Sequence, residues 1–143
     1  MNSVNQILSR KGSFAISIDT GTTVLDALKL MAEKNIGSVV VTGTDGNYKG
    51  IVTERDYSRK VILKGKSSTD TKVEEIMSTD LPRVSMQDSV EHCMELMTEK
   101  NIRYLPVFAG NELKGIISMS DVVKDTILRQ QETIDHLQQY ISL

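Results

Sequence analysis

The sequence predicts an α/β fold that consists of tandem β-α-β-β-α repeats, packed with pseudo-twofold symmetry and followed by a long C-terminal helix. Three observations predict this fold. Residues 23–36 of the 143-residue chain return 66 positions later as residues 89–102, which indicates an internal repeat. Within each copy, apolar residues at helical spacing alternate with short apolar runs typical of buried strands. The stretch 121–141 contains no Gly or Pro, and therefore predicts a continuous helix.

The repeat covers nearly the whole chain. The string Glu-Lys-Asn-Ile is identical in both copies, and past a single-residue gap residues 49–56 match residues 114–121. A repeat of about 60 residues is marginal alone, so we expect the copies to pack sheet against sheet. The leading residues also correspond, as Val4 with Val73, Ile7 with Ile76 and Leu8 with Met77. We place the first domain at residues 7–65, a polar linker at 66–75, the second domain at 76–132 and a helical extension at 133–143.

Each copy begins with a short strand, which we expect near residues 15–18 in the first copy and at residues 83–84 in the second. An amphipathic helix follows, because apolar residues recur at positions i, i+3, i+4 and i+7. The pairs Thr23 with Asp26 and Asp88 with Glu91 predict N-terminal caps for these helices. The apolar positions are Val24, Ala27, Leu28 and Met31 in the first helix, and Val90, Cys93, Met94 and Met97 in the second.

A β-hairpin follows the helix in each copy. Residues 39–41 and 105–108 are apolar runs rich in β-branched or aromatic residues, which are typical of buried strands. Turn residues such as Gly46 lead from these runs into the next strands, at 48–52 and 113–117. Each of these strands runs directly into a second helix.

The second helix of the second copy is longer than the repeat. Ile127, Ile134 and Ile141 recur every seven residues, with Leu137 between them. An apolar seam of this kind needs a partner. It either folds back onto the first repeat or pairs with another copy of the chain, and we favour self-association.

Composition excludes several classes of protein. Seventeen Lys and Arg against nineteen Asp and Glu give a net charge of −2, so nucleic acid is not an expected partner. The single Cys93 excludes an internal disulfide, and with only two histidines no metal cofactor is expected. Apolar runs are too short to span a membrane. The N-terminus has no signal-peptide pattern, so we expect a cytoplasmic protein.

Two short segments could carry binding chemistry, Thr53–Asp56 and Ser118–Asp121. In each, a hydroxyl residue ends a strand and an acid follows three residues later, in the first helical turn. One interpretation is structural, because such a hydroxyl caps the helix and the acid lies near the positive end of its dipole. The other is functional: helix-start N–H groups favour phosphate, the hydroxyl donates to it, and the carboxylate accepts from a ribose hydroxyl pair.

The repeated unit resembles a tandem pair of cystathionine-β-synthase-type (CBS) domains, also called a Bateman module. The resemblance covers about nine-tenths of the chain and leaves no separate catalytic domain, as in stand-alone bacterial-type CBS pairs. The matching features are the approach segment Val73–Met77, the helix end Leu-Met-x-Glu-Lys-Asn-Ile, the strand Arg103–Val107 and the closing Gly-Ile-Ile-Ser-x-x-Asp that ends at Asp121.

The resemblance implies that each repeat contributes specific residues to two nucleotide clefts between the repeats. It places Asp56 and Asp121 on the ribose hydroxyls, and Thr53 and Ser118 on phosphate. Arg103 is a basic residue expected to face phosphate, whereas Gly37 takes its place in the first copy and makes the two clefts unequal. Further expected pocket residues are Ser17, Ile18, Gly37, Ser38 and Val39, with Arg55 near phosphate, and Arg83, Val84, Tyr104, Leu105 and Pro106.

The function implied is regulation by an adenine nucleotide, with AMP first among AMP, ADP, ATP and NAD(H). The module is expected to act through a homodimer, parallel or antiparallel, on a further protein. Two alternatives remain open: a sensor of S-adenosylmethionine, and an interaction module that needs no ligand. An enzyme that acts on nucleotides is not expected, because no nucleophile–base pair or metal cluster is present in the sequence.

Overall fold

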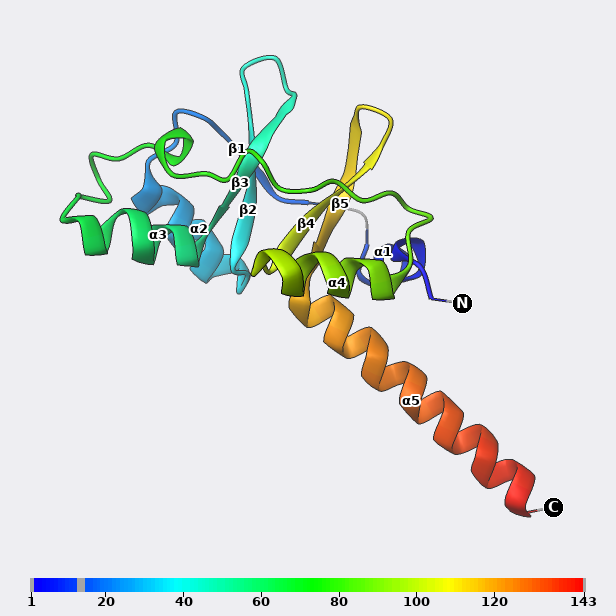
Figure 1. Ribbon diagram of the computed structural model, residues 1–143. Coiled ribbons are helices and arrows are strands. Elements are labelled where there is room, and N and C mark those ends of the chain that lie inside the picture. Colours follow the sequence, from blue (N-terminus) through cyan, green and yellow to red (C-terminus); the bar gives the residue numbers. More distant parts are fainter. Residues whose placement is uncertain (1, 13–14, 143) are drawn as a thin grey trace. The chain divides into compact units, whose positions relative to one another are not determined.

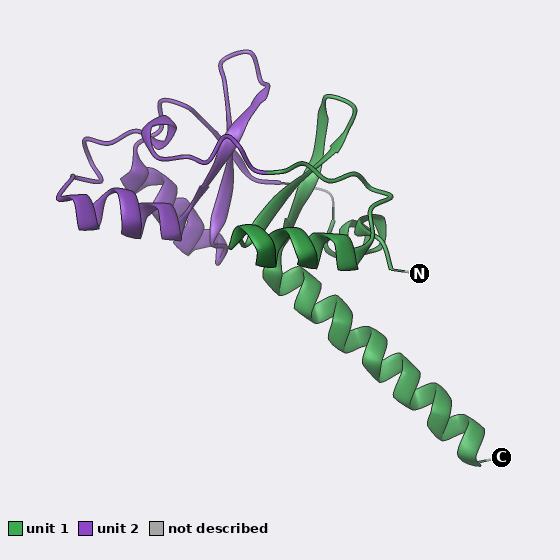
Figure 2. Cartoon of the chain, viewed as in Figure 1, with its two compact units in different colours: residues 1–13, 82–143 green, residues 14–81 purple. Residues whose placement is uncertain are grey.

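The structure, a computed structural model, describes residues 2–12 and 15–142. These residues form two compact units, each of which carries one repeat (Figure 2). Unit 2 contains residues 15–81 and the first repeat, and unit 1 contains residues 2–12 and 82–142 with the second repeat. The α/β class and the long C-terminal helix that the sequence predicts are both confirmed.

Unit 2 is a three-stranded sheet with helices (Figure 1). The sheet order is β1-β2-β3, with β1 parallel and β3 antiparallel to β2. The predicted initial strand, helix and hairpin of the first repeat are all present. The elements are β1 (Ser17–Asp19), α2 (Val24–Lys34), β2 (Ser38–Thr42), β3 (Tyr48–Thr53), α3 (Glu54–Lys60) and the 3-10 turns η1 (Ile62–Lys64) and η2 (Val73–Glu75).

Unit 1 has a two-stranded antiparallel sheet, β4-β5. The prediction of an initial strand at residues 83–84 is wrong. Val84 forms only an isolated parallel bridge to Val107. Pro106 explains the difference, because it has no N–H with which β4 could extend the ladder toward residue 82. The elements are α1 (Val4–Lys11), α4 (Val90–Lys100), β4 (Tyr104–Ala109), β5 (Glu112–Ser118) and α5 (Met119–Ser142).

The caps of α2 and α4 are hydroxyl residues. Thr23 Oγ1 accepts the Asp26 N–H at 3.2 Å, as the sequence predicts. The prediction that Asp88 caps α4 is wrong. Ser89 caps this helix by accepting the His92 N–H at 3.0 Å. The Asp88 carboxylate instead accepts the Ser85 N–H at 2.7 Å, in the turn before the helix.

Buried apolar residues form two clusters, one in each unit. Each cluster collects the inward face of one amphipathic helix and the inward residues of its sheet. Cys93 is fully buried in the unit 1 cluster at the position that Ala27 occupies in unit 2, which confirms it as a core residue. The clusters are Val4, Ile7, Leu8, Val84, Val90, Cys93, Met97, Leu105, Val107, Ile117 and Val122 in unit 1, and Val24, Ala27, Met31, Val39, Val41, Val52, Val61, Val73 and Ile76 in unit 2.

The segments that lead into the two repeats are exchanged between the units. Helix α1, which precedes the first repeat, packs into the core of unit 1 through Val4, Ile7 and Leu8. Val73 and Ile76, which precede the second repeat, belong to the core of unit 2. The compact units therefore do not follow the repeat boundaries, because each lead segment buries its apolar side chains against the other repeat.

Residues 66–75, expected to be a polar linker, include a folded part of unit 2. The Ser68 and Thr71 carbonyls accept the N–H groups of Leu25 and Val24, at 2.9 and 2.8 Å, and thereby satisfy the first turn of α2. Thr71 is buried, and its hydroxyl donates to the Ser67 carbonyl. The polar residues of this segment therefore contribute to unit 2 largely through their backbone carbonyls.

Helix α5 spans 24 residues, and its second half extends away from the other elements of unit 1 (Figure 1). Val122 and Asp125, near its start, are buried in unit 1, whereas every residue from 130 to 142 is exposed. Among the described residues, no helix combines the length and the apolar character that crossing a membrane requires.

Candidate functional site

The junction between β3 and α3 in unit 2 is a capping box. Thr53 ends the strand and caps the helix, with its Oγ1 accepting the Asp56 N–H at 3.0 Å. The Asp56 carboxylate returns to the strand and accepts both the Thr53 N–H, at 2.9 Å, and the Thr53 hydroxyl, at 3.1 Å. Asp56 is only 8% exposed, so the junction holds a nearly buried carboxylate in a fixed orientation.

The junction between β5 and α5 in unit 1 repeats this arrangement. Ser118 Oγ accepts the Asp121 N–H at 3.1 Å, and Asp121 Oδ2 accepts the Ser118 N–H at 2.8 Å. The structure thus places all four predicted ribose and phosphate residues in two equivalent junctions, one in each unit. We call these the Asp56 junction and the Asp121 junction.

The first hairpin strand begins beside each junction. Ser38 is paired with Thr53, and the Gly37 carbonyl accepts the N–H of the first residue of α3 at 3.2 Å. In unit 1, Tyr104 is paired with Ser118, and the Arg103 carbonyl accepts the Met119 N–H at 2.8 Å. Strand register therefore brings Gly37 and Ser38 beside the Asp56 junction, and Arg103 and Tyr104 beside the Asp121 junction.

Helix-start N–H groups contribute less to each junction than the sequence led us to expect. In α3 the N–H groups of Thr53, Glu54 and Asp56 are all engaged within the junction, which accounts for three of the four that a helix start leaves open. The same three positions are engaged at the start of α5. An anion at either junction would therefore depend mainly on side chains, which corrects the expectation of a grip by backbone amides.

Several predicted pocket residues can offer only backbone atoms. The side chains of Val39, Leu105 and Val84 are at most 2% exposed and lie in the two cores. Pro106 is buried, and its carbonyl accepts the Val84 N–H at 3.0 Å. The remaining predicted residues Ser17, Ile18, Ser38 and Tyr104 are exposed or partly exposed, so their side chains remain accessible.

Each carboxylate is paired with a lysine that sequence reasoning missed. Lys60 Nζ lies 3.0 Å from Asp56 Oδ1, one turn along α3, and also donates to the Ile76 carbonyl at 2.8 Å. Lys11 Nζ lies 2.7 Å from Asp121 Oδ2 and donates to the Ile116 carbonyl at 3.0 Å. The i, i+4 spacing of Asp56 and Lys60 was a readable signal. Lys11 gave none, because it comes from the exchanged helix α1.

The predicted basic residues differ in their surroundings. The Arg83 guanidinium lies over the Phe108 ring at 3.9 Å, a cation–π contact that holds this side chain against β4. Arg103 is exposed at the start of β4, and Arg55 is partly exposed in the first turn of α3. Arg103 in unit 1 corresponds to Gly37 in unit 2, whereas Arg55 in unit 2 corresponds to Ser120 in unit 1, so the two copies carry this arginine at different positions.

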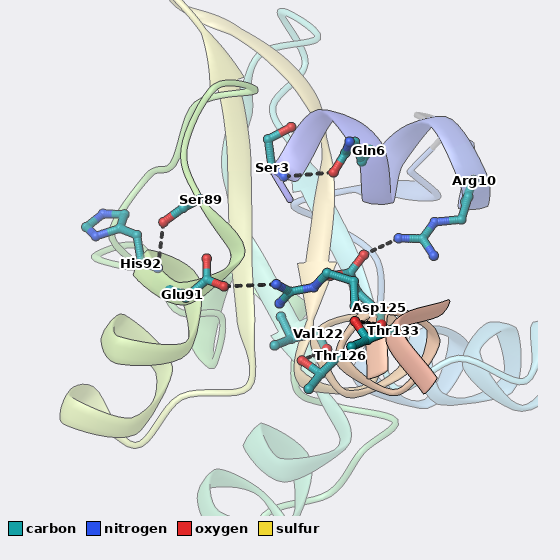
Figure 3. A network of polar contacts seen from close by, with 11 residues as sticks. Ser3, Gln6, Arg10, Ser89, Glu91, His92, Val122, Asp125, Thr126 and Thr133 are labelled. Carbon is teal, nitrogen blue, oxygen red and sulfur yellow. Dashed lines mark hydrogen bonds and ion pairs between the residues drawn. The ribbon is translucent and has the colours of Figure 1, made fainter. Parts of the chain in front are cut away.

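Unit 1 also contains a polar network that the sequence did not reveal (Figure 3). Asp125 is 1% exposed and forms ion pairs with Arg10 of α1 and with Arg129 one turn along α5. Arg129 Nη1 also lies 3.2 Å from the Glu91 carboxylate of α4. The network joins three helices of unit 1. The i, i+4 spacing of Asp125 and Arg129 was a readable signal, whereas Arg10 and Glu91 are too distant in sequence for a local pattern to mark them.

Within the described part of the chain, no three His, Cys, Asp or Glu residues are placed to share a metal ion. Burial raises the pKa of the Cys93 thiol to about 11, which makes this side chain a poor nucleophile at neutral pH. The junctions present hydroxyl, carboxylate and basic groups, which can recognise a ligand through hydrogen bonds and charge.

Comparison with known proteins identifies the family. The sequence profile of the CBS domain matches residues 8–62 and again residues 73–126. The chain therefore belongs to the CBS domain family and carries a tandem pair of these domains.

Curated relatives match most of this chain and extend beyond its length. The chain is 36% identical to the mitochondrial CBS domain-containing protein CBSX3 of Arabidopsis thaliana, over 96% of this chain and 71% of that one. Two other curated relatives are longer still. This chain spans 38% of the length of one and 23% of the length of the other.

Solved structures agree with this assignment. A protein with CBS domains from Burkholderia ambifaria superposes with a TM-score of 0.85 at 45% identity, covering 90% of this chain and 96% of that one. A hexameric CBS-CP12 protein from bloom-forming cyanobacteria superposes with a TM-score of 0.74 at 34% identity, covering 85% of this chain and 66% of that one. The fold is therefore that of a CBS pair.

Proposed function

We propose that the chain is a regulatory module that binds an adenine nucleotide and acts through a homodimer on a further protein. AMP is the first candidate, followed by ADP, ATP and NAD(H), with S-adenosylmethionine as an alternative. One observation carries the proposal: a CBS pair presents the same hydroxyl-and-carboxylate junction twice, once in each unit. A capping box alone requires neither the partly exposed strand start nor the basic residue beside it.

The roles follow from the chemistry of the side chains. The Asp56 and Asp121 carboxylates accept hydrogen bonds from the two ribose hydroxyls. Ser118 donates to phosphate, and Thr53 does so once its hydroxyl turns away from Asp56. Arg55 and Arg103 supply positive charge, and the adjacent strand backbones contact adenine. Because the arginine belongs to the helix start in unit 2 and to the strand start in unit 1, we expect the two junctions to bind phosphate with unequal affinity.

The proposed mechanism of regulation is linkage. A nucleotide that binds one arrangement of the dimer better than another shifts the population toward that arrangement by its differential affinity. A hexameric relative of known structure supports the expectation that such modules assemble into oligomers.

One observation favours a second candidate, an interaction module without a ligand. Both carboxylates already accept backbone N–H groups and are paired with lysines. They therefore have hydrogen-bond and ion-pair partners without a nucleotide. A nucleotide at either junction must displace or reorient Lys11 or Lys60.

Calorimetric titration with AMP, ATP, NADH and S-adenosylmethionine tests the proposal. We expect Asp56→Ala and Asp121→Ala each to weaken binding by roughly tenfold or more, because a hydrogen bond to a charged group contributes about 1.5–3 kcal/mol. Glu54→Ala and Ser120→Ala are matched controls, since both residues are exposed in the same helical turns. Absence of heat with every ligand at millimolar concentration, or a loss of stability without a loss of affinity, would favour the module without a ligand.

We also propose that the protein is not an enzyme. Incubation with ATP or NADH, followed by chromatography of the nucleotides, checks this directly. Any product that accumulates in proportion to protein concentration would overturn it.

A further inference from the structure

We infer that the second half of α5 forms a parallel, in-register, two-stranded coiled coil with α5 of a second copy of this chain. The inference starts from the exposed apolar seam of this helix, which consists of Val123, Ile127, Ile134, Leu137 and Ile141. These five side chains are between 47% and 80% exposed. An apolar stripe of this length on a helix that leaves its own unit is typical of an interaction surface.

The seam is separate from the face of α5 that packs on unit 1. Val122, Asp125, Thr126 and Arg129 are buried or partly buried against the unit. With about 3.6 residues per turn, the seam lies roughly a third of a turn around the helix from that face. Unit 1 therefore anchors the first turns of α5 and leaves the seam open along the rest.

The seam follows a coiled-coil heptad. If Ile127, Ile134 and Ile141 occupy position a, then Val123, Gln130 and Leu137 occupy position d. Isoleucine at all three a positions, with Leu137 at one of the d positions, favours two strands. The exposed part is short, but its helix is already nucleated by the anchored turns, so pairing does not bear the cost of starting a helix.

The residues beside the seam make a second copy of the chain a compatible partner. In a parallel pair, position g of one helix faces position e of the other one heptad later, which brings Thr126 to Gln131 and Thr133 to Gln138. All four are uncharged, so identical helices meet without like-charge repulsion. The charged residues Arg129, Glu132 and Asp135 lie at positions that point away from a partner.

Gln130 specifies the orientation. In a parallel, in-register pair the two Gln130 amides face each other across the seam and can hydrogen-bond. In an antiparallel pair each amide faces an apolar a-position residue, and a buried amide without a partner is costly. A polar residue at one core position of a coiled coil commonly fixes its register in this way.

Two experiments on the full-length chain test the inference. In sedimentation velocity, Ile134→Glu is expected to weaken self-association at least about a hundredfold, because both copies lose a buried isoleucine and gain facing charges. Gln139→Glu, on the outward face of the same helix, is the matched control. Circular dichroism is expected to show both variants folded, since both positions are exposed.

Cysteine cross-linking tests the orientation. Ile141→Cys is expected to oxidise rapidly to a disulfide-linked dimer, because identical a positions meet only in a parallel pair, whereas Gln139→Cys is not. Cys93 does not interfere, since it is buried. Unchanged self-association of Ile134→Glu would overturn the seam, and an association-competent Ile141→Cys that does not cross-link would overturn the parallel arrangement. Neither result depends on nucleotide binding.

Discussion

Asp125 is a nearly buried carboxylate whose charge is compensated by two arginines from different helices. Arg10 of α1 forms an ion pair with it, and Arg129 Nε lies 3.2 Å from Oδ2. Removing one member of a buried ionic group is costly because the other charges lose their partner. Both arginines are about a third or more exposed, so water compensates part of that loss.

We therefore expect Asp125→Ala to lower the free energy of unfolding by about 2 kcal/mol, measured by urea denaturation. Asp135→Ala is the matched control on the same helix, where an exposed carboxylate accepts from Gln131 at 2.9 Å. The control is expected to change stability by less than about 0.5 kcal/mol. Equal effects of the two variants would show that the network does not stabilise unit 1.

Cys93 is the other residue whose surroundings set its chemistry. Burial, with a smaller contribution from Asp88, raises the pKa of its thiol from 9.0 to about 11. In the native state the thiolate is therefore rare at neutral pH, and access to the sulfur is blocked. We expect DTNB to react with native protein at least about a hundredfold more slowly than with protein in urea.

The same pKa difference predicts a pH dependence of stability. Above pH 9.0 the unfolded thiol loses its proton while the native thiol keeps it until about pH 11. The unfolded state then binds fewer protons, so this contribution to stability is complete below pH 9 and is lost as the pH rises toward 11. Cys93→Ala, which copies Ala27 of the first repeat, is expected to remove this part of the slope in urea titrations. An unchanged slope would contradict the assignment.

At the scale of elements, helices α2 and α4 end in the same way. Asn35 and Asn101 adopt left-handed backbone conformations, with φ of 54° and 53°. The next residues, Ile36 and Ile102, donate to the carbonyls of Met31 and Met97 at 2.9 and 3.0 Å. Asn tolerates this conformation better than other residues with a Cβ, which explains why both copies carry Asn between the helix and the following strand.

Substitutions at Asn35 separate conformation from side-chain contacts. We expect Asn35→Ala to destabilise the protein by about 1 kcal/mol, because Ala pays the left-handed penalty, whereas Asn35→Gly is expected to be close to neutral. Thermal unfolding followed by circular dichroism measures both. A Gly variant as unstable as the Ala variant would show that the Asn side chain, rather than its backbone, matters.

These elements also show how far the sequence can be read. The repeat, both hairpins and the α5 overrun were predictable because each is encoded in local periodicity and turn residues. The strand expected at residues 83–84 does not form, because Pro106, more than 20 positions away, prevents its ladder from extending. The four junction residues were correctly placed side by side, whereas Lys11 and Asp125 depend on a helix packed from the far end of the chain.

At the scale of the whole molecule, each compact unit depends on a segment from outside its own repeat. Ile7 of α1 is buried in the core of unit 1, and Ile76 is buried in the core of unit 2. The sequence showed that these residues correspond, but similarity between two copies cannot tell which copy each segment packs on. The exchange also couples the Asp121 junction to the N-terminus, since Lys11 and Ile7 lie on the same helix.

The exchange predicts where a core mutation acts. Ile7→Ala is expected to cost about 3 kcal/mol, and to reduce amide-exchange protection in residues 82–142 more than in residues 15–81, because local opening follows the compact units. Ile76→Ala is expected to show the reverse pattern. Ser9→Ala, exposed on α1, is the control and should leave both regions protected. If Ile7→Ala instead loosened residues 15–81, the lead segments would pack on their own repeats, and Lys11 could not be the partner of Asp121.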